Sequence, residues 1–160
     1  TLYAARAPSP AWFHYSALAQ ALAGRTTEAI EILLEGVQAY PRSGVLQNNL
    51  AVALERQRDF AGALSAIERG LADDPGIPQL HKNQGDSHYR AGRFDEALES
   101  YQRAVRLNEA LGADVWLKLG NIRFKRAERD DAVRCWERAL AIEPEHHVVR
   151  RNLETAKAFS

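Results

Sequence analysis

Small residues recur along this chain at one spacing, and that spacing constrains the fold more than any other feature. The first recurring residue is an alanine, at Ala29, Ala63, Ala97 and Ala132. These alanines stand 34, 34 and 35 residues apart. A second small residue follows seven positions after each alanine, at Gly36, Gly70, Ala104 and Ala139. A period near 34 residues indicates one supersecondary unit that is repeated four times and packs on its neighbours.

Each unit also carries a bulky apolar residue and a terminating residue in register. The bulky residue stands between the two small ones, at Leu33, Ile67, Tyr101 and Trp136. Proline closes three units, at Pro41, Pro75 and Pro144, and Glu109 takes its place in the third unit. Small residues let two helices approach closely, and a bulky neighbour fills the remaining space. Because proline ends a helix, each unit is predicted to be a pair of helices that ends at this point.

The four units resemble tetratricopeptide repeats (TPRs) over about residues 10–145. The resemblance is carried by WLKLG at residues 116–120, with the small and bulky residues that follow it, and by GRFDEALESYQRA at residues 92–104. It implies an all-α fold, a right-handed α-solenoid of four helix-turn-helix TPR units plus a C-terminal capping helix. The units would occupy residues 10–43, 44–77, 78–112 and 113–146.

Apolar spacing and turn residues predict where the helices begin and end. The paired helices are expected at residues 10–23, 26–39, 44–56, 60–73, 78–91, 94–107, 113–126 and 129–142. We interpret residues 147–160 as a helix that caps the array, or as the first helix of a truncated fifth unit. Residues 1–9 are interpreted as an N-terminal extension. The chain contains no methionine, so we expect it to be part of a longer protein.

The composition argues against several functional classes. Lys plus Arg and Asp plus Glu both number 21, so we expect neither general nucleic-acid binding nor attraction to a membrane surface. No apolar run approaches the ~18 residues of a membrane span. The single cysteine, Cys135, cannot form an internal disulfide, and we expect a cytoplasmic protein. We expect no catalysis, no metal and no cofactor, because no nucleophile–base pair or ligand cluster stands at a usable spacing.

The predicted function depends on the first helix of each unit. In the TPR family this helix lines the concave face, so the resemblance implies that its polar residues form a peptide-binding groove. An asparagine amide both donates and accepts, so a row of asparagines can hold a peptide backbone whatever side chains it carries. The alternative is that these asparagines are solvated or bond to loop backbone. The predicted groove residues are Asn48, Asn49, Lys82, Asn83, Asp86, Tyr89, Arg90, Lys118, Asn121, Lys125, Arg151 and Asn152.

The same face is predicted to be basic. Its carboxylates, Asp86 and Asp114, are outnumbered by the cations of Lys82, Arg90, Lys118, Lys125 and Arg151. A concave wall of low dielectric constant focuses such a field. We therefore predict a protein–protein interaction module that binds an extended, acidic peptide segment. The alternatives are a self-assembling scaffold that forms a homo-oligomer, and a regulatory TPR domain of a larger multidomain enzyme.

Overall fold

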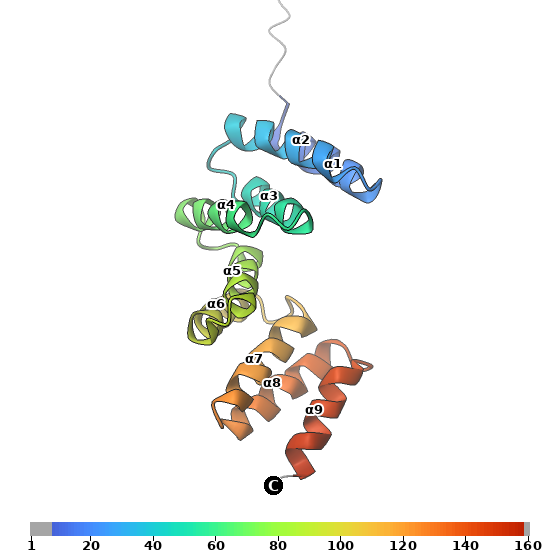
Figure 1. Ribbon diagram of the computed structural model, residues 1–160, viewed down its shortest axis with the longest axis vertical. Helices are drawn as coiled ribbons and strands as arrows, with labels where there is room; N and C mark the ends of the chain where they lie inside the picture. The colour runs from blue at the N-terminus through green and yellow to red at the C-terminus, as the bar shows by residue number, and fades with distance from the viewer. Residues whose placement is uncertain (1–7, 159–160) are drawn as a thin grey trace, which may run out of the picture. The chain divides into compact units, whose positions relative to one another are not determined.

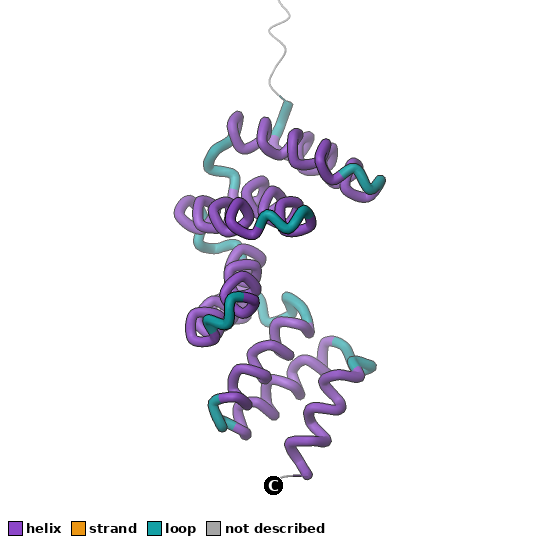
Figure 2. The backbone as a smooth tube through the Cα atoms, viewed as in Figure 1, coloured by secondary structure: helices purple, strands orange, loops and turns teal. Residues whose placement is uncertain are grey.

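The computed structural model describes residues 8–158, and these residues form helices joined by short turns, with no strand among them (Figures 1 and 2). The first eight helices match the predicted ranges to within one residue. The predicted N-terminal extension lies outside the described residues except for Pro8 and Ser9, and so do residues 159–160 of the last predicted helix. The helices are α1 (Pro10–Leu22), α2 (Thr26–Ala39), α3 (Gly44–Arg56), α4 (Phe60–Asp73), α5 (Pro78–Arg90), α6 (Phe94–Leu107), α7 (Ala113–Lys125), α8 (Arg129–Ile142) and α9 (His147–Ala158).

Side-chain caps explain where several helices begin. The hydroxyl of Ser9 accepts a hydrogen bond from the backbone N–H of Trp12 at 3.2 Å, and Pro10 occupies the first turn, where its missing N–H costs nothing. The carboxylate of Asp59 accepts from the backbone N–H of Gly62 at 2.9 Å. Each cap satisfies one of the backbone donors that the first turn of a helix leaves without a partner.

The turn within each pair of helices uses one left-handed residue. The φ angles are +77° at Gly24, +64° at Arg58, +73° at Gly92 and +62° at Ala127. These four residues occupy the same position in successive repeats. Glycine adopts this conformation without steric cost, whereas a residue with a Cβ is strained there. Two of the four turns therefore carry a conformational penalty.

The first of two compact units spans residues 1–80 and contains α1 to α4 and the first residues of α5. The small residues at its helix crossings explain how closely these helices pack. A Cβ added to Gly36 would lie 2.9 Å from Cγ of Phe13, and one added to Gly70 would lie 2.8 Å from Cδ1 of Leu80. Its core is made of Phe13, Ala17, Ala29, Ile30, Leu33, Leu46, Leu50, Ala51, Ala53, Ala63, Ala66, Ile67 and Leu80.

The second unit spans residues 81–160 and contains the rest of α5 and the helices α6 to α9. Tyr101 is fully buried against α5, where a Cβ on Gly85 would lie 2.6 Å from the tyrosine ring. A Cβ on Gly120 would overlap the indole of Trp136 in the same way. The helix α9 packs on α8 through Val149, Leu153 and Ala156. The opposite face of α9 is exposed and carries Arg150, Arg151, Glu154 and Lys157.

Candidate functional site

A pocket of about 230 Å³ opens on the second unit, where first helices of successive pairs present their polar residues. Four of its seven lining residues are among the residues predicted from the sequence: Tyr89, Asn121, Lys125 and Asn152. The other three are Phe124, Trp136 and Thr155. One or two predicted groove residues from each of α5, α7 and α9 thus line one cavity, and the other predicted residues of these helices do not line it. Their role in binding a ligand stays a prediction.

A hydrogen-bond network fixes the orientation of the Asn121 amide, which lines this pocket. The oxygen Oδ1 of Asn121 accepts from Nδ2 of Asn152 at 3.1 Å and from Nε1 of Trp136 at 3.3 Å. An indole N–H only donates, so the oxygen of Asn121 must face Trp136. The NH₂ group of Asn121 therefore points away from the indole. It is a donor that a peptide carbonyl can use.

Two aromatic rings, Phe124 and Trp136, and the cation of Lys125 line the same pocket. The rings of Phe124 and Trp136 lie 5.5 Å apart between centroids. The ammonium of Lys125 lies 4.0 Å from the centroid of the Phe94 ring, which in turn packs edge-on against Tyr89. A cation over an aromatic face is stabilised by the ring quadrupole. The charge of Lys125 is therefore held beside the pocket rather than dispersed in solvent.

Next to the pocket, Lys118 and Asp86 form an ion pair. The ammonium of Lys118 lies 2.5 Å from Oδ1 of Asp86, and the hydroxyl of Tyr101 donates to the same oxygen at 2.6 Å. Burial of Tyr101, and then the negative charge of Asp86, raise the pKa of the phenol far above its usual value. The phenol therefore stays protonated and acts as a permanent donor to the carboxylate.

A second ion pair joins Lys82 to Asp114 at 3.0 Å, with both side chains partly exposed. Two of the five cations assigned to the basic face are thus compensated locally. The sequence predicted an excess of positive charge along this face, and these two ion pairs reduce it. The other three cations are Lys125, which lies over the Phe94 ring, and the arginines Arg90 and Arg151. The two arginines are exposed.

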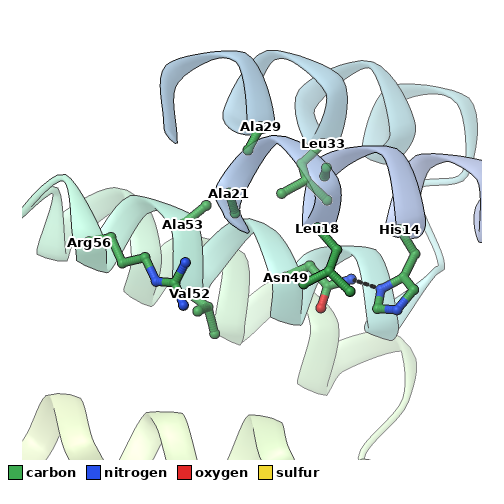
Figure 3. Close-up of a pocket in the computed structure, with 10 residues that line it drawn as sticks. His14, Leu18, Ala21, Ala29, Leu33, Asn49, Val52, Ala53 and Arg56 are labelled. Atoms are coloured by element: carbon green, nitrogen blue, oxygen red, sulfur yellow. Dashed lines mark hydrogen bonds between the residues drawn. The ribbon is translucent and has the colours of Figure 1, made fainter. Parts of the chain in front are cut away.

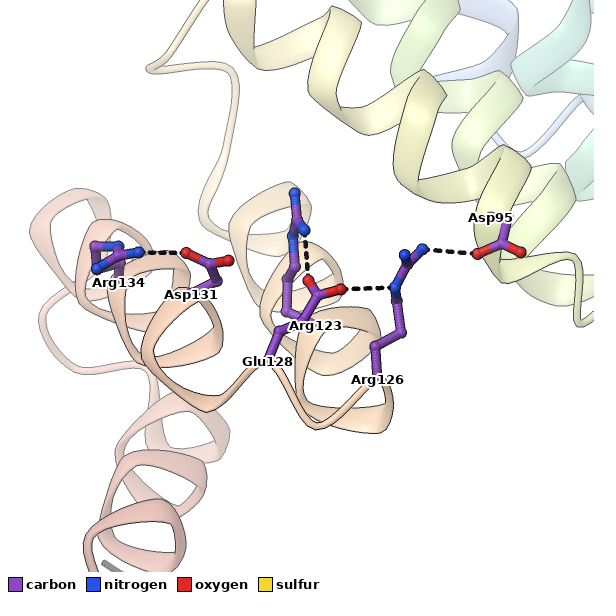
Figure 4. A network of polar contacts seen from close by, with 6 residues as sticks. All are labelled: Asp95, Arg123, Arg126, Glu128, Asp131 and Arg134. Carbon is purple, nitrogen blue, oxygen red and sulfur yellow. Dashed lines mark hydrogen bonds and ion pairs between the residues drawn. The ribbon is translucent and has the colours of Figure 1, made fainter.

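A separate polar network lies at the turn between α7 and α8 (Figure 4). Glu128 pairs with Arg123 and with Arg126, which lies 2.9 Å away, and Arg126 reaches Asp95 of α6 at 2.8 Å. The hydrogen bond from Arg123 holds the pKa of the Glu128 carboxyl below its usual value. The sequence analysis did not identify this network, because its members sit outside the repeat positions that face the pocket.

In the first unit, Asn49 lies beside an apolar pocket of about 110 Å³ (Figure 3). Its Nδ2 lies 2.7 Å from Nδ1 of His14, so the amide donates and the imidazole accepts. The predicted residues Asn48 and Asn83 are half-buried. The sequence analysis did not predict this pocket. Leu18 and Val52 could have indicated it, because both are apolar and occupy the same position in successive repeats. The pocket is lined by His14, Ala17, Leu18, Ala21, Ala29, Leu33, Asn49, Val52, Ala53 and Arg56.

The described residues were also compared with what a metal site, a membrane-spanning helix and a reactive cysteine require. Within residues 8–158, no three side chains of His, Cys, Asp and Glu gather as a metal site would require. No helix in the same range combines the length and the apolar character needed to cross a bilayer. Burial raises the pKa of the Cys135 thiol above its usual value, so the reactive thiolate is disfavoured.

Comparison with known proteins identifies the family to which these repeats are similar. Residues 48–114 match a family model described as "Tetratricopeptide repeat", and residues 113–146 match a second model of the same description. Protein O-mannosyl-transferase TMTC1 of Mus musculus is 33% identical over an alignment of 143 residues that covers 86% of this chain. The match covers 15% of that relative, so the chain spans a small part of its length.

Solved structures show the same fold. One described as "Crystal structure of MamA protein" has a TM-score of 0.77 at 18% identity, over 92% of this chain and 80% of that chain. Another, "First TPR of Spaghetti (RPAP3) bound to HSP90 peptide SRMEEVD", has a TM-score of 0.65 at 22% identity, over 72% of this chain and 90% of that chain. At these identities the similarity supports the fold alone.

Proposed function

Because the chain belongs to the tetratricopeptide-repeat family, we propose that it is a protein–protein interaction module that holds an extended peptide along the first helices of its pairs. The observation that carries this proposal is the convergence of Tyr89, Asn121, Lys125 and Asn152 around one pocket. These residues come from three helices, and their side chains offer a donor, an acceptor, a cation and an aromatic surface. A polypeptide segment presents partners for all four.

The amides supply recognition of the backbone. The NH₂ group of Asn121 can donate to a peptide carbonyl, and Oδ1 of Asn152 can accept from a peptide N–H. Each such hydrogen bond contributes about 0.5–1.5 kcal/mol net, so these two bonds alone give weak binding. The proposal therefore requires further contacts, which the aromatic rings of Tyr89 and Phe124 supply by covering apolar side chains of the peptide.

We further propose that the peptide is acidic. The cation of Lys125 stands at the rim of the pocket, and the exposed Arg151 lies on α9 next to Asn152 in sequence. The pairing of Lys118 with Asp86 reduces this preference, so we expect a moderate rather than an exclusive selection for carboxylates. The RPAP3 structure supports the idea in outline, because the peptide named in its description, SRMEEVD, is acidic.

A second candidate is the same binding role inside a longer enzyme. The chain matches 15% of a protein named as an O-mannosyl-transferase. In this candidate the repeats bind a segment of the enzyme or of its protein substrate and carry out no chemistry themselves. Both candidates make the same prediction for the pocket, and they differ in the origin of the peptide.

The test is a selection of phage-displayed random peptides on the isolated chain, followed by titration of the enriched sequences. We expect enrichment of peptides with Asp and Glu, and at least tenfold weaker binding to the double variant Asn121→Ala, Asn152→Ala. The matched control is Asn108→Ala, which removes an exposed asparagine at the end of α6. Failure to enrich any peptide, or equal binding by the double variant and the control, would refute the proposal.

A further inference from the structure

The apolar pocket of the first unit lies at the same repeat position as the pocket lined by Asn121 and Asn152 in the second unit. Leu18 is the ninth residue of α1, as Asn121 is of α7. Asn49 is the sixth residue of α3, as Asn152 is of α9. The two pockets are therefore two versions of one place in the repeat, and their differences show what each can hold.

The aromatic rings that occupy this place in the second unit are missing from the first. Phe124 is the twelfth residue of α7, and the twelfth residue of α1 is Ala21. Trp136 of α8 has Leu33 of α2 at its repeat position. These smaller side chains leave a pocket of about 110 Å³ between α1, α2 and α3. All of its lining comes from these three helices, so the pocket is a property of their own side chains.

The size and lining of the pocket suit one aliphatic side chain. Ala17, Ala29 and Ala53 are buried in its lining, whereas Leu18 is 45% exposed and gives the pocket an apolar surface towards solvent. Its volume is well below the roughly 300–1,000 Å³ of a small-molecule site. An apolar cavity of about 150 Å³ holds one benzene molecule. The size therefore favours a single branched side chain that belongs to a larger ligand.

Two polar residues of the lining match the backbone of a polypeptide ligand. The NH₂ group of Asn49 donates to Nδ1 of His14 at 2.7 Å, so Oδ1 of Asn49 is turned away from the imidazole (Figure 3). Because Nδ1 of His14 accepts, the proton of the neutral ring lies on Nε2, which is a donor. An acceptor and a donor are the two partners that the N–H and C=O groups of one peptide residue need.

Arg56 adds a positive charge that the pocket itself does not compensate. None of the ten lining residues is Asp or Glu. In contrast, Lys118 beside the second pocket is paired with Asp86 at 2.5 Å. In Figure 3 the side chain of Arg56 extends along α3 towards Val52. A guanidinium binds a carboxylate with matched geometry, so the ligand is expected to carry an acidic group here.

The spacing along α3 indicates where that acidic group stands in the ligand. Arg56 follows Asn49 by seven residues, which is about 10 Å along the helix axis. In an extended peptide, side chains two residues apart lie on the same side and about 6.6 Å from each other. The length of an arginine side chain covers the difference. An acidic residue two positions from the aliphatic one therefore reaches Arg56.

We propose that this pocket holds a leucine or isoleucine side chain of an extended partner peptide that has Asp or Glu two residues away. The aliphatic side chain fills the space between Ala21 and Leu33. Asn49 and His14 bind the backbone of the same peptide residue, and Arg56 binds the carboxylate. This inference rests on the proposed function, because its ligand is a polypeptide, and it adds the residue type that the first unit selects.

The test is a titration of the isotope-labelled chain with the peptide acetyl-Asp-Ala-Leu-Ala-Asp-amide, followed by nuclear magnetic resonance. This peptide has an acidic residue two positions from leucine on each side and no terminal carboxylate. We expect shifts at the Asn49 side-chain amide and at Val52, with a dissociation constant of about 0.1–1 mM. Replacing its leucine with alanine should weaken binding at least tenfold. Replacing both aspartates with asparagine should weaken it about three- to fivefold at low salt.

Variants of the chain test the same contacts from the other side. Ala21→Phe fills the pocket with the ring that α7 carries at this position, so it should weaken binding at least tenfold. Its matched control is Ala19→Phe, because Ala19 is an exposed alanine of the same helix outside the pocket. Arg56→Gln should abolish the preference for the aspartate peptide, whereas Arg69→Gln, an exposed arginine of α4, should keep it. Circular dichroism verifies that each variant is folded.

Several outcomes would overturn the inference. They are no shift at about 10 mM peptide, equal binding of the leucine and alanine peptides, and equal binding by folded Ala21→Phe and Ala19→Phe. Stronger binding of acetyl-Ala-Ala-Leu with a free carboxylate would also overturn it, because Arg56 would then hold a chain end. If Ala21→Phe does not fold, Arg56→Gln and the peptide series decide. Selected peptides that need Asn121 and Asn152 but bind Ala21→Phe normally would refute this inference and leave the proposed function intact.

Discussion

Asp86 accepts hydrogen bonds from Lys118 and from Tyr101 on the same carboxylate oxygen. The distances are 2.5 Å from the ammonium and 2.6 Å from the hydroxyl, and the Asp86 side chain is 18% exposed. Because the carboxylate is shared, it compensates Lys118 and also satisfies the buried phenol. The charge near the pocket lined by Asn121 and Asn152 and the stability of the α5–α6 pair therefore depend on one residue.

Replacing Asp86 with asparagine should strengthen binding of an acidic peptide and weaken the fold. Asparagine keeps an acceptor oxygen for Tyr101 but removes the charge that compensates Lys118. One added unit of effective charge near the ligand is equivalent to about 1 kcal/mol, or about fivefold in affinity at low salt. The loss of a charged hydrogen bond should lower the free energy of unfolding by about 1–2 kcal/mol. Titration calorimetry and urea unfolding measure the two effects.

The matched control for this variant is Asp95→Asn. Asp95 is 85% exposed in its side chain and pairs with Arg126, away from the pocket. We expect its removal to change neither affinity nor stability by a measurable amount, because exposed ion pairs contribute little. The gain in affinity for Asp86→Asn should also disappear at 0.5 M salt. A gain that persists at high salt would contradict the electrostatic explanation.

The raised pKa of Tyr101 predicts a loss of stability in alkali. In the unfolded chain the phenol ionises near its ordinary value of 10.0, whereas burial and Asp86 keep it protonated in the folded chain. The folded state then binds more protons than the unfolded state above that pH, so the free energy of unfolding falls as pH rises. Below that pH the phenol is protonated in both states, so its contribution to the free energy of unfolding is fully present.

The measurement is denaturant unfolding of the wild type and of Tyr101→Phe between pH 7 and pH 11. Lysine residues also titrate in this range, so the informative quantity is the difference between the two proteins. We expect the difference in free energy of unfolding to be constant at neutral pH. Above about pH 10 the wild type should lose stability relative to Tyr101→Phe. Parallel curves for the two proteins would show that Tyr101 ionises normally in the folded chain.

The sequence predicted the helices closely because their determinants are local and periodic. Each repeat carries its own signals: a small residue such as Gly36 or Ala139 and a bulky residue before it, and in three repeats a proline that ends the second helix. The match of the helix ranges follows from that redundancy.

The pocket was predictable only in part. The repeat register placed Asn121 and Asn152 on equivalent first helices, and the structure brings them into contact at 3.1 Å. The register did not reveal that Lys118 pairs with Asp86 across 32 residues, because side-chain pairing depends on rotamers and on the helix crossing. Nor did it reveal that the amide of Asn49 is engaged with His14.

The strained turn at Ala127 predicts a stabilising substitution. Ala127 has a φ of +62° at the position where two other repeats have glycine. Ala127→Gly should therefore raise the free energy of unfolding by about 0.5–1 kcal/mol, because the relief of strain exceeds the added entropy of the unfolded chain. The reverse change, Gly92→Ala at the equivalent turn, should lower it by a similar amount. Thermal unfolding of both variants checks the sign, and a destabilised Ala127→Gly would contradict it.

The indole of Trp136 is expected to control the orientation of Asn121. Its Nε1 donates to Oδ1 of Asn121 at 3.3 Å and also to the backbone oxygen of Leu117 at 3.3 Å. Trp136→Phe removes this donor but leaves an aromatic ring in the core. The remaining partner, Asn152, is an amide that can donate or accept, so the two amides can then rotate together and the NH₂ group of Asn121 no longer points in one direction.

We expect Trp136→Phe to weaken binding of the selected peptide about five- to tenfold, which is the effect of one hydrogen bond. Nuclear magnetic resonance should show the side-chain amide protons of Asn121 broadened or shifted. Trp116→Phe is the matched control, because Trp116 does not line the proposed binding pocket and its Nε1 donates to the backbone oxygen of Glu109 at 2.8 Å. Both variants should lose stability by about 1–2 kcal/mol from the smaller ring. Equal affinities for the two variants would mean that the orientation of Asn121 does not matter for binding.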